Sequence, residues 1–330
     1  MLYLIGNEQC SNALARMVNK KCVPNTLLFY GPDGVGKSLF ALQLAELLMG
    51  EEHGPKIASN NHPDIHIYHP EGKSGLHPID SMRKLIQEVA LPPFEAPVKV
   101  FIIHDAHQML PYSSNALLKT LEEPPLDTYL ILLTSALDAI LPTICSRCRK
   151  IPFFPIPQQQ IETFVKEQWE TKEDAARRIA FLSHGSLAKA KRLADANPIA
   201  YRTPLMEILS LKFPGEYPHF LKLAAALEES LSQESEEGED EEEGGMNALQ
   251  QADLLFEEII AWHRDLHLVK EGGAFEFLYH LDQMDRLKES AARPLEPLER
   301  TLERVAECRL ALQRHVKLKT VLEHFFLHTA

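Results

Sequence analysis

The sequence lacks the features that mark secreted, disulfide-stabilised and membrane proteins. Its five cysteines are an odd number spread over 330 residues, which argues against a disulfide framework and indicates a reducing compartment. No stretch approaches 18 consecutive apolar residues, so we expect no membrane span. The first residues form a short apolar run with no basic segment before it and no small-residue cleavage site after it. We therefore expect a cytoplasmic protein.

One close pair of cysteines is present, Cys145 and Cys148 in the stretch CSRC. A structural zinc site would need a second pair, and Cys10, Cys22 and Cys308 do not supply one. We interpret the stretch as a turn that leads into a strand. Metal or redox chemistry at this pair is the alternative.

A basic surface of the kind that binds nucleic acid is also lacking, because the formal net charge is −13. Ten acidic residues and no basic residue lie in 228–245, so leaving out this segment changes the net charge from −13 to −3. So many like charges with little apolar surface predict a disordered loop. The near-neutral remainder predicts weak DNA contact for this chain alone.

Strand and helix signals alternate over the first 155 residues. Apolar runs typical of buried strands, such as TLLFY, VFII and LILL, alternate with segments of helical spacing, such as KSLFALQLAELLM and SSNALLKTLEE. This order predicts an α/β fold with a parallel sheet and helices on both faces. Beyond Pro157 the patterns are helical. We predict an α/β domain over 1–155, a small helical domain over 156–203 and an all-helical domain over 204–330.

The stretch GPDGVGKS, residues 31–38, fits the phosphate-binding pattern G-x-x-x-x-G-K-[ST] between a predicted strand and a predicted helix. Glycines there let backbone N–H groups face phosphate oxygens, Lys37 would reach the β- and γ-phosphates, and the Ser38 hydroxyl would bind Mg²⁺. The expected ligand is ATP or ADP with Mg²⁺, and a glycine-rich turn without ligand is the alternative. The predicted binding residues are Gly31, Pro32, Asp33, Gly34, Val35, Gly36, Lys37 and Ser38.

The acids that ATP hydrolysis requires are incomplete. A P-loop hydrolase places one acid after a neighbouring strand to hold magnesium and a second acid beside it to orient water. Here His104 and Asp105 follow the strand VFII. If His104 takes the magnesium position, the ion meets an imidazole in place of oxygen. If Asp105 takes it, the next residue, Ala106, has no carboxylate to orient the attacking water. Either register predicts poor or absent hydrolysis, and we expect His104 and His107 to be solvent-facing loop residues.

Several motifs resemble those of bacterial DNA polymerase III clamp-loader subunits of the AAA+ class in order and spacing. They are GPDGVGKS, KVFIIHDAHQM, SSNALLKTLEEPP and LPTICSRCRKIPF. The resemblance implies an AAA+ domain, a helical lid and a helical collar, in a complex that opens the sliding clamp and loads it on primed DNA. It also implies that Arg147 is an arginine finger for a neighbouring subunit's ATP site. A basic surface or a structural ion pair is the alternative interpretation of Arg147.

Three departures from the family's motor subunits, gamma and tau, favour its delta-prime subunits, which turn over little or no ATP. His104 and Asp105 stand where the motors have Asp-Glu, and Ala188 stands where they have an arginine that reaches the γ-phosphate. The stretch FEEIIAWHRDLHLVKEGG resembles the delta-prime collar. The resemblance implies a stator that packs with gamma/tau-like and delta-like subunits in the polymerase III holoenzyme, with Asp105 as a degenerate magnesium acid. An active gamma/tau-like motor remains the alternative, and an unrelated P-loop kinase would not explain SRC.

Many subunits of this family have a four-cysteine zinc module after the P-loop helix. This chain has no cysteine between residues 22 and 145. The histidines of the corresponding region are irregularly spaced and come without thiolates, so we predict no zinc site. These histidines are His53, His62, His66 and His69.

Overall fold

A computed structural model describes residues 5–71, 75–195, 198–211, 215–236, 248–314 and 316–327. The chain divides into two compact units. The first comprises Met1–Ile161 with Gly185–Ala188, and the second comprises Glu162–His184 with Lys189–Ala330. None of the described helices is both long and apolar enough to cross a membrane.

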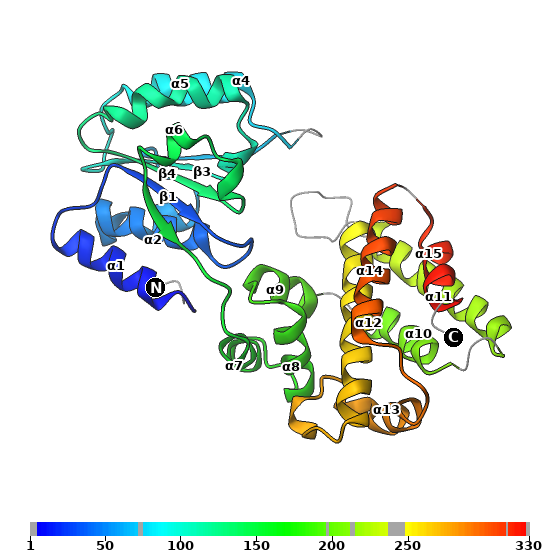
Figure 1. The fold of residues 1–330 in the computed structure, drawn as a ribbon. Helices are drawn as coiled ribbons and strands as arrows, with labels where there is room; N and C mark the ends of the chain where they lie inside the picture. Colours follow the sequence, from blue (N-terminus) through cyan, green and yellow to red (C-terminus); the bar gives the residue numbers. More distant parts are fainter. Residues whose placement is uncertain are drawn as a thin grey trace. The chain divides into compact units, whose positions relative to one another are not determined.

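The first unit is built on a five-stranded sheet in the order β2-β3-β4-β1-β5 (Figure 1). All neighbouring strands are parallel, which confirms the predicted α/β class. β3 is buried along its whole length, as expected for a strand that reads as a continuous apolar run. The strands are β1 Thr26–Tyr30, β2 Ile65–Tyr68, β3 Lys99–Ile103, β4 Thr128–Thr134 and β5 Arg149–Pro152.

Helices cover both faces of this sheet, as predicted, with α1 and α2 on one face and α4 and α5 on the other (Figure 1). Alternate residues of one strand enter two different cores, because side chains of a strand point to opposite faces. Phe29 packs with Phe40 of α2, and Leu28 packs with Leu85 of α4 and Leu117 of α5. The helices are α1 Glu8–Asn19, α2 Lys37–Met49, η1 Glu51–His53, α3 Gly54–Ala58, α4 Ile79–Val89, η2 Ala106–Gln108, α5 Pro111–Glu122, η3 Leu137–Ala139 and α6 Pro142–Cys145.

The described residues beyond β5 form helices, as the sequence predicts. Phe220, Phe256, Trp262 and Phe325 are fully buried in the core of the second unit. The elements are α7 Gln158–Gln168, α8 Glu173–Leu182, α9 Leu187–Asp195, α10 Pro198–Ser210, α11 Tyr217–Glu236, α12 Ala248–Lys270, η4 Phe275–Phe277, η5 Leu281–Gln283, α13 Met284–Ala291, α14 Leu298–Gln313 and α15 Leu318–Leu327.

Two details of the helical part differ from the predicted layout. The predicted boundary between 203 and 204 falls inside α10, which contains Pro204, so the prolines there do not end a helix. The division into a lid and a collar stays a prediction. α11 continues to Glu236, so the first part of the segment 228–245 is helical. Apolar spacing through buried Phe220 and Leu227 and good helix formers such as Glu extend this helix, and residues 237–247 lie outside the described part.

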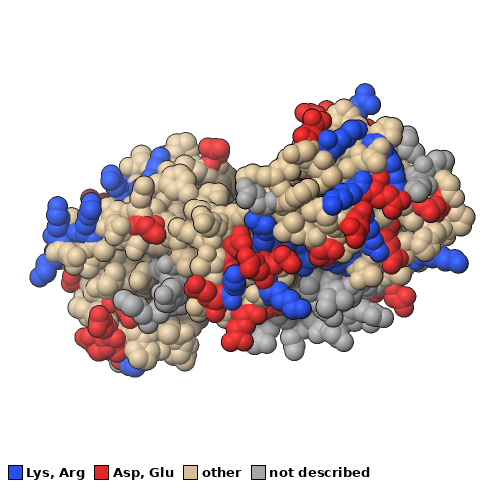
Figure 2. Space-filling model, turned by 90° about the horizontal axis from the view of Figure 1, so that it is seen from below, with Lys and Arg blue, Asp and Glu red and all other residues tan. Residues whose placement is uncertain are grey.

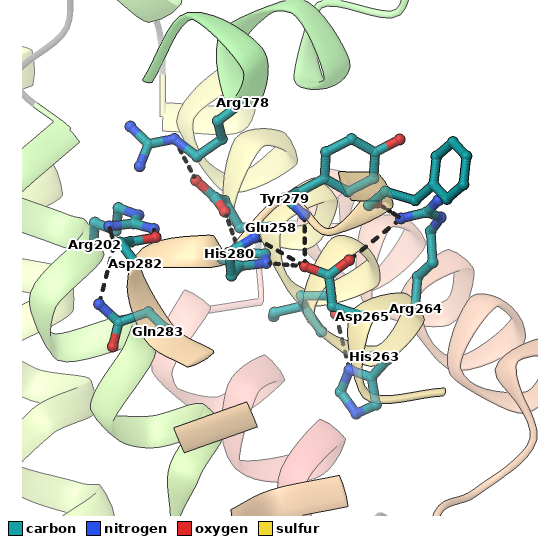
Figure 3. Close-up of polar contacts among 12 residues, drawn as sticks. Arg178, Arg202, Glu258, His263, Arg264, Asp265, Tyr279, His280, Asp282 and Gln283 are labelled. Atoms are coloured by element: carbon teal, nitrogen blue, oxygen red, sulfur yellow. Dashed lines mark hydrogen bonds and ion pairs between the residues drawn. The ribbon is translucent and has the colours of Figure 1, made fainter. Parts of the chain in front are cut away.

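A buried charged cluster joins α12 to the segment before α13 (Figure 3). His280 Nδ1 lies 2.9 Å from Asp265 Oδ2, and its Nε2 lies 2.9 Å from Glu258 Oε2. All three residues are fully buried. Burial lowers the pKa of His280, but the hydrogen bonds and negative charges of Asp265 and Glu258 outweigh it and raise that pKa above its ordinary value. Each ring nitrogen faces a carboxylate oxygen, which only accepts hydrogen bonds, so the geometry is that of an imidazolium donating from both nitrogens.

Candidate functional site

The P-loop, residues 31–38, joins β1 to α2 at the carboxyl end of the sheet. Gly31 and Gly36 have φ values of 147° and 95°, which residues with a side chain rarely adopt. A Cβ on Gly31 would also lie 2.1 Å from the carbonyl oxygen of Phe153. The sharp turn from strand into helix therefore requires glycine at these positions.

The ammonium group of Lys37 is held by its own loop. Nζ donates to the carbonyl oxygens of Gly31 at 2.6 Å and Pro32 at 2.7 Å, and it lies 3.5 Å from Asp33 Oδ1. Burial lowers the pKa of Lys37 despite the opposing charges of Asp33 and Asp105. A phosphate group is the natural replacement for these carbonyl partners, because it would restore a full negative charge beside the ammonium group.

We expect Lys37→Ala to weaken ATP binding to the purified chain by about tenfold or more, because the variant loses a charge-assisted hydrogen bond to phosphate. Titration with a fluorescent ATP analogue measures this. Lys84→Ala on α4 is the matched control, because Lys84 is an exposed lysine of another helix. Equal affinities of the two variants would show that Lys37 does not contact nucleotide.

The histidine after β3 is packed among other histidines. The rings of His104 and His69 lie 4.1 Å apart, and the His104 carbonyl oxygen accepts a hydrogen bond from His77 Nε2 at 2.6 Å. Burial and the positive charges that His69, His77 and Lys37 can bear lower the pKa of His104 to about 4. His104 is therefore neutral at pH 7 and gives magnesium no negative charge.

The expectation that His104 and His107 face solvent is wrong, since both are partly buried. His107 Nδ1 lies 3.1 Å from the hydroxyl of Thr134 at the end of β4. Sequence reasoning also missed His77, which is 1% exposed. Its partner is a backbone carbonyl, and no sequence pattern marks such a contact.

Asp105 is the one acid that the described residues place near Lys37 after β3. It has a left-handed backbone with φ of 43°, and its charge acts to raise the pKa of Lys37. The next residue, Ala106, is 2% exposed and has no polar side-chain atom. The site thus offers one carboxylate where hydrolysis normally uses two.

The first turn of α9 packs against the P-loop within the first unit. The amides of Leu187 and Ala188 lie 2.8 and 3.3 Å from the carbonyl oxygen of Gly34. A Cβ on Gly34 would lie 2.0 Å from Ser186 Oγ and 2.9 Å from the Ala188 methyl group. Ala188 therefore brings a methyl group and no positive charge to this position.

Arg147 lies at the amino ends of the strands, whereas the P-loop lies at their carboxyl ends. The Arg147 carbonyl oxygen accepts the hydroxyl hydrogen of Thr26, the first residue of β1, at 2.9 Å, whereas the P-loop follows the last residue of β1. Five strand residues span about 16 Å. Arg147 therefore cannot serve the P-loop of its own chain. Its guanidinium forms an ion pair with Glu122, and the Arg147 side chain is 30% exposed.

The two cysteines on either side of Arg147 are free thiols. Burial, with a smaller contribution from Cys145, raises the pKa of Cys148 to about 12. Metal binding and nucleophilic chemistry require a thiolate. These properties favour the interpretation of CSRC as a turn into β5 over metal or redox chemistry.

Two of the four histidines considered for zinc come together in the structure. His62 Nε2 lies 2.8 Å from His53 Nδ1 and 3.3 Å from Glu95 Oε1, a group that could hold a metal ion by distance alone. However, the Asp64 amide donates to His62 Nδ1 at 3.1 Å, so the proton of neutral His62 is on Nε2 and blocks that ligand atom. The absence of zinc stays a prediction. The other two histidines lie elsewhere: the His66 ring stacks on Phe101, and the His69 ring contacts His104 at a tilt.

The parallel sheet in this strand order, with the sequence pattern of a P-loop directly after β1, is an α/β fold of the P-loop type. The family model described as DNA polymerase III, delta subunit, matches residues 6–157. The DNA polymerase III subunit delta-prime of Bacillus subtilis is 33% identical over 197 residues, 57% of this chain and 59% of that protein. Replication factor C small subunit 1 of Pyrobaculum islandicum is 30% identical over 237 residues, 65% of this chain and 68% of that protein. The chain is thus similar to DNA polymerase III delta-prime subunits and to a replication factor C small subunit.

The match with the Bacillus subtilis subunit spans less than two thirds of that protein's length. Among solved structures, a DNA polymerase III gamma subunit-related protein from Thermotoga maritima aligns with 96% of this chain and 97% of its own chain. The sequence identity of that pair is 20% and the TM-score is 0.48.

Proposed function

We propose that this chain is a delta-prime-like clamp-loader subunit that supplies Arg147 to the ATP site of a neighbouring subunit and turns over little or no ATP itself. The observation that supports this most strongly is that Arg147 and the P-loop lie at opposite ends of the strands. An always-charged guanidinium at the surface suits the charge that develops on a transferred γ-phosphate. With its own loop out of reach, the phosphate must belong to another subunit.

Three residues outside the P-loop support weak turnover at this chain's own nucleotide site. His104 is neutral at pH 7, Ala106 has no side-chain oxygen, and Ala188 provides no cation. The loop residues themselves suit ATP or ADP with Mg²⁺, for which Lys37 and Ser38 would contact phosphate and metal. The chain would thus bind nucleotide without the acid pair that orients an attacking water.

The proposed partners are gamma/tau-like and delta-like subunits, with the sliding clamp and primed DNA reached through the complex. On the face of the helical unit drawn in Figure 2, basic side chains lie beside acidic ones. Arg309, for example, pairs with Asp253 and Glu257. Cations paired with acids release few counterions on binding DNA. We therefore expect this chain alone to bind DNA weakly.

An assembly experiment tests this role. Purified chain, cognate gamma/tau-like and delta-like subunits, clamp and primed DNA are combined, and ATP turnover and clamp loading are followed. We expect a stable complex in sedimentation and at least about a tenfold loss of clamp-stimulated turnover when this chain is left out. Full turnover without it would contradict the proposal.

An active gamma/tau-like motor is the second candidate function, favoured by the proximity of Asp105 to Lys37. A motor would hydrolyse ATP at its own loop when a partner supplies the missing arginine. The measurement must therefore include partner subunits, because an isolated motor also lacks a neighbour's finger.

A further inference from the structure

The guanidinium of Arg147 is held in place by its own chain. Nε donates to Glu122 Oε1 at 2.6 Å, and Nη2 contacts the same oxygen. Nη1 lies 2.9 Å from the Thr143 carbonyl oxygen and 3.4 Å from Ser146 Oγ. A guanidinium has five N–H hydrogens, and these contacts use four of them. One Nη2 hydrogen is left without an acceptor among the residues that the structure describes.

Hydrogen bonds also hold the backbone of Arg147. Its amide donates to the Ile144 carbonyl oxygen at 3.0 Å, and its carbonyl accepts the Thr26 hydroxyl. A long, flexible side chain is thereby held in one orientation before any partner binds. Such preorganisation matters for a group that must meet a phosphate in one geometry.

Glu122 occupies a position where an acid is electrostatically unfavourable. It is the last residue of α5, and the carboxyl end of a helix repels negative charge. The cation of Arg147 offsets this cost. The next residue, Glu123, is equally acidic, yet the contacts of the described residues include none between its carboxylate and Arg147.

The pair remains open to a ligand. The side chains of Arg147 and Glu122 are 30% and 48% exposed, and the following Arg149 and Lys150 are exposed as well. Arg149 and Lys150 add positive charge to the segment that follows Arg147. An oxyanion could reach the Nη2 edge without breaking the contacts to Glu122 and Thr143.

We infer that Glu122 is a positioning residue, which holds Arg147 so that its free Nη2 edge meets a phosphate oxygen of a neighbouring subunit. The inference rests on the proposed function, because it gives Arg147 the role of a finger. Glu122 itself touches no nucleotide. Loss of its charge lets the guanidinium sample several orientations, which lowers the rate of the chemical step more than the affinity for ATP.

The test is a double-mutant cycle in the complete reconstituted loader with clamp and primed DNA. The variants are Glu122→Gln, Arg147→Ala and the double variant, with Glu123→Gln as the matched control one residue away. The rate of ATP turnover is measured against ATP concentration, and the thermal stability of each purified chain is recorded. We expect Glu122→Gln to lower kcat about tenfold with KM changed by less than about twofold. In the Arg147→Ala background the same change should have no further effect, and Glu123→Gln should match the wild type.

Different outcomes overturn different parts of this inference. Wild-type turnover of Arg147→Ala would overturn the finger, and with it the role of Glu122. Impaired turnover of Arg147→Ala with normal kcat of Glu122→Gln would overturn the role of Glu122 alone. An equal loss from Glu122→Gln in both backgrounds, or with a lowered melting temperature, would show that Glu122 acts on stability and not through Arg147.

Discussion

Arg147→Ala is expected to lower the rate of ATP hydrolysis at the neighbouring subunit's site by about 10³-fold, the low end of the range for arginine fingers. The physical reason is that the truncated side chain leaves the charge that develops on the γ-phosphate unpaired. Single-turnover hydrolysis by the reconstituted loader, with clamp and primed DNA, measures the rate at that site.

Arg149→Ala is the matched control for this experiment. Arg149 is an exposed arginine two residues further along, at the start of β5, so its removal changes the surface charge by the same amount. We expect its rate to stay within about twofold of the wild type, because an exposed charge at this distance acts only through a screened field. Equal losses for both variants would assign the effect to surface charge and contradict the finger.

His280→Gln is expected to lower the free energy of unfolding of the helical unit by about 3–5 kcal/mol, the range for breaking a buried ion pair. The variant leaves the carboxylates of Glu258 and Asp265 buried without the imidazolium that faces both (Figure 3). Urea unfolding followed by tryptophan fluorescence is a suitable measurement, because the ring of buried Trp262 lies 5.5 Å from the His280 ring.

His184→Gln is the control for this stability measurement. His184 also pairs with a glutamate, Glu257 at 2.7 Å, but its side chain is 51% exposed. Glu257 keeps its ion pair with Arg309 at 2.7 Å when His184 is replaced, so no carboxylate is left without a cation and the loss should be small. Similar losses for the two variants would contradict the charged state that we assign to His280.

The stability that His280 provides should depend on pH in a defined direction. Because its pKa is raised on folding, its contribution is complete below the ordinary value of 6.5 and is lost as the pH rises through the raised value. The pKa of Glu258 is lowered from 4.5: burial acts to raise it, but His280 and nearby arginines outweigh burial. The contribution of Glu258 is therefore complete above 4.5 and is lost as the pH falls through the lowered value. The difference between wild type and His280→Gln should be largest between about pH 4.5 and 6.5.

The parts of the fold that local pattern determines could be predicted from the sequence. Strands such as β3 and β4 are continuous apolar runs because both faces of a parallel sheet are buried. The P-loop is marked by glycines whose backbone conformations other residues rarely adopt. The strand end at Ile103, and with it the histidine at position 104, follows from the same pattern.

The contacts that long-range packing determines could not be predicted in this way. His104 contacts His69 and His77, which come from a preceding segment of the chain. These contacts make His104 neutral and partly buried, which its position in a loop does not predict. The pairing of Glu122 with Arg147 joins the end of α5 to the turn before β5, and the motifs that contain them do not show which of two adjacent glutamates makes the contact. The cluster around His280 has no periodic signal, because its members come from a helix and a short irregular segment.

The proposed role gives this chain an arginine that acts at a neighbour's ATP site and a P-loop that hydrolyses little or no ATP. The most direct measurement compares Lys37→Ala and Arg147→Ala, each assembled into the complete loader, in ATP turnover stimulated by clamp and primed DNA, with assembly verified by sedimentation. We expect Lys37→Ala to keep turnover within about twofold of the wild type and Arg147→Ala to abolish hydrolysis at one site. Loss of turnover with Lys37→Ala and normal turnover with Arg147→Ala would contradict the proposed role and identify the chain as a motor.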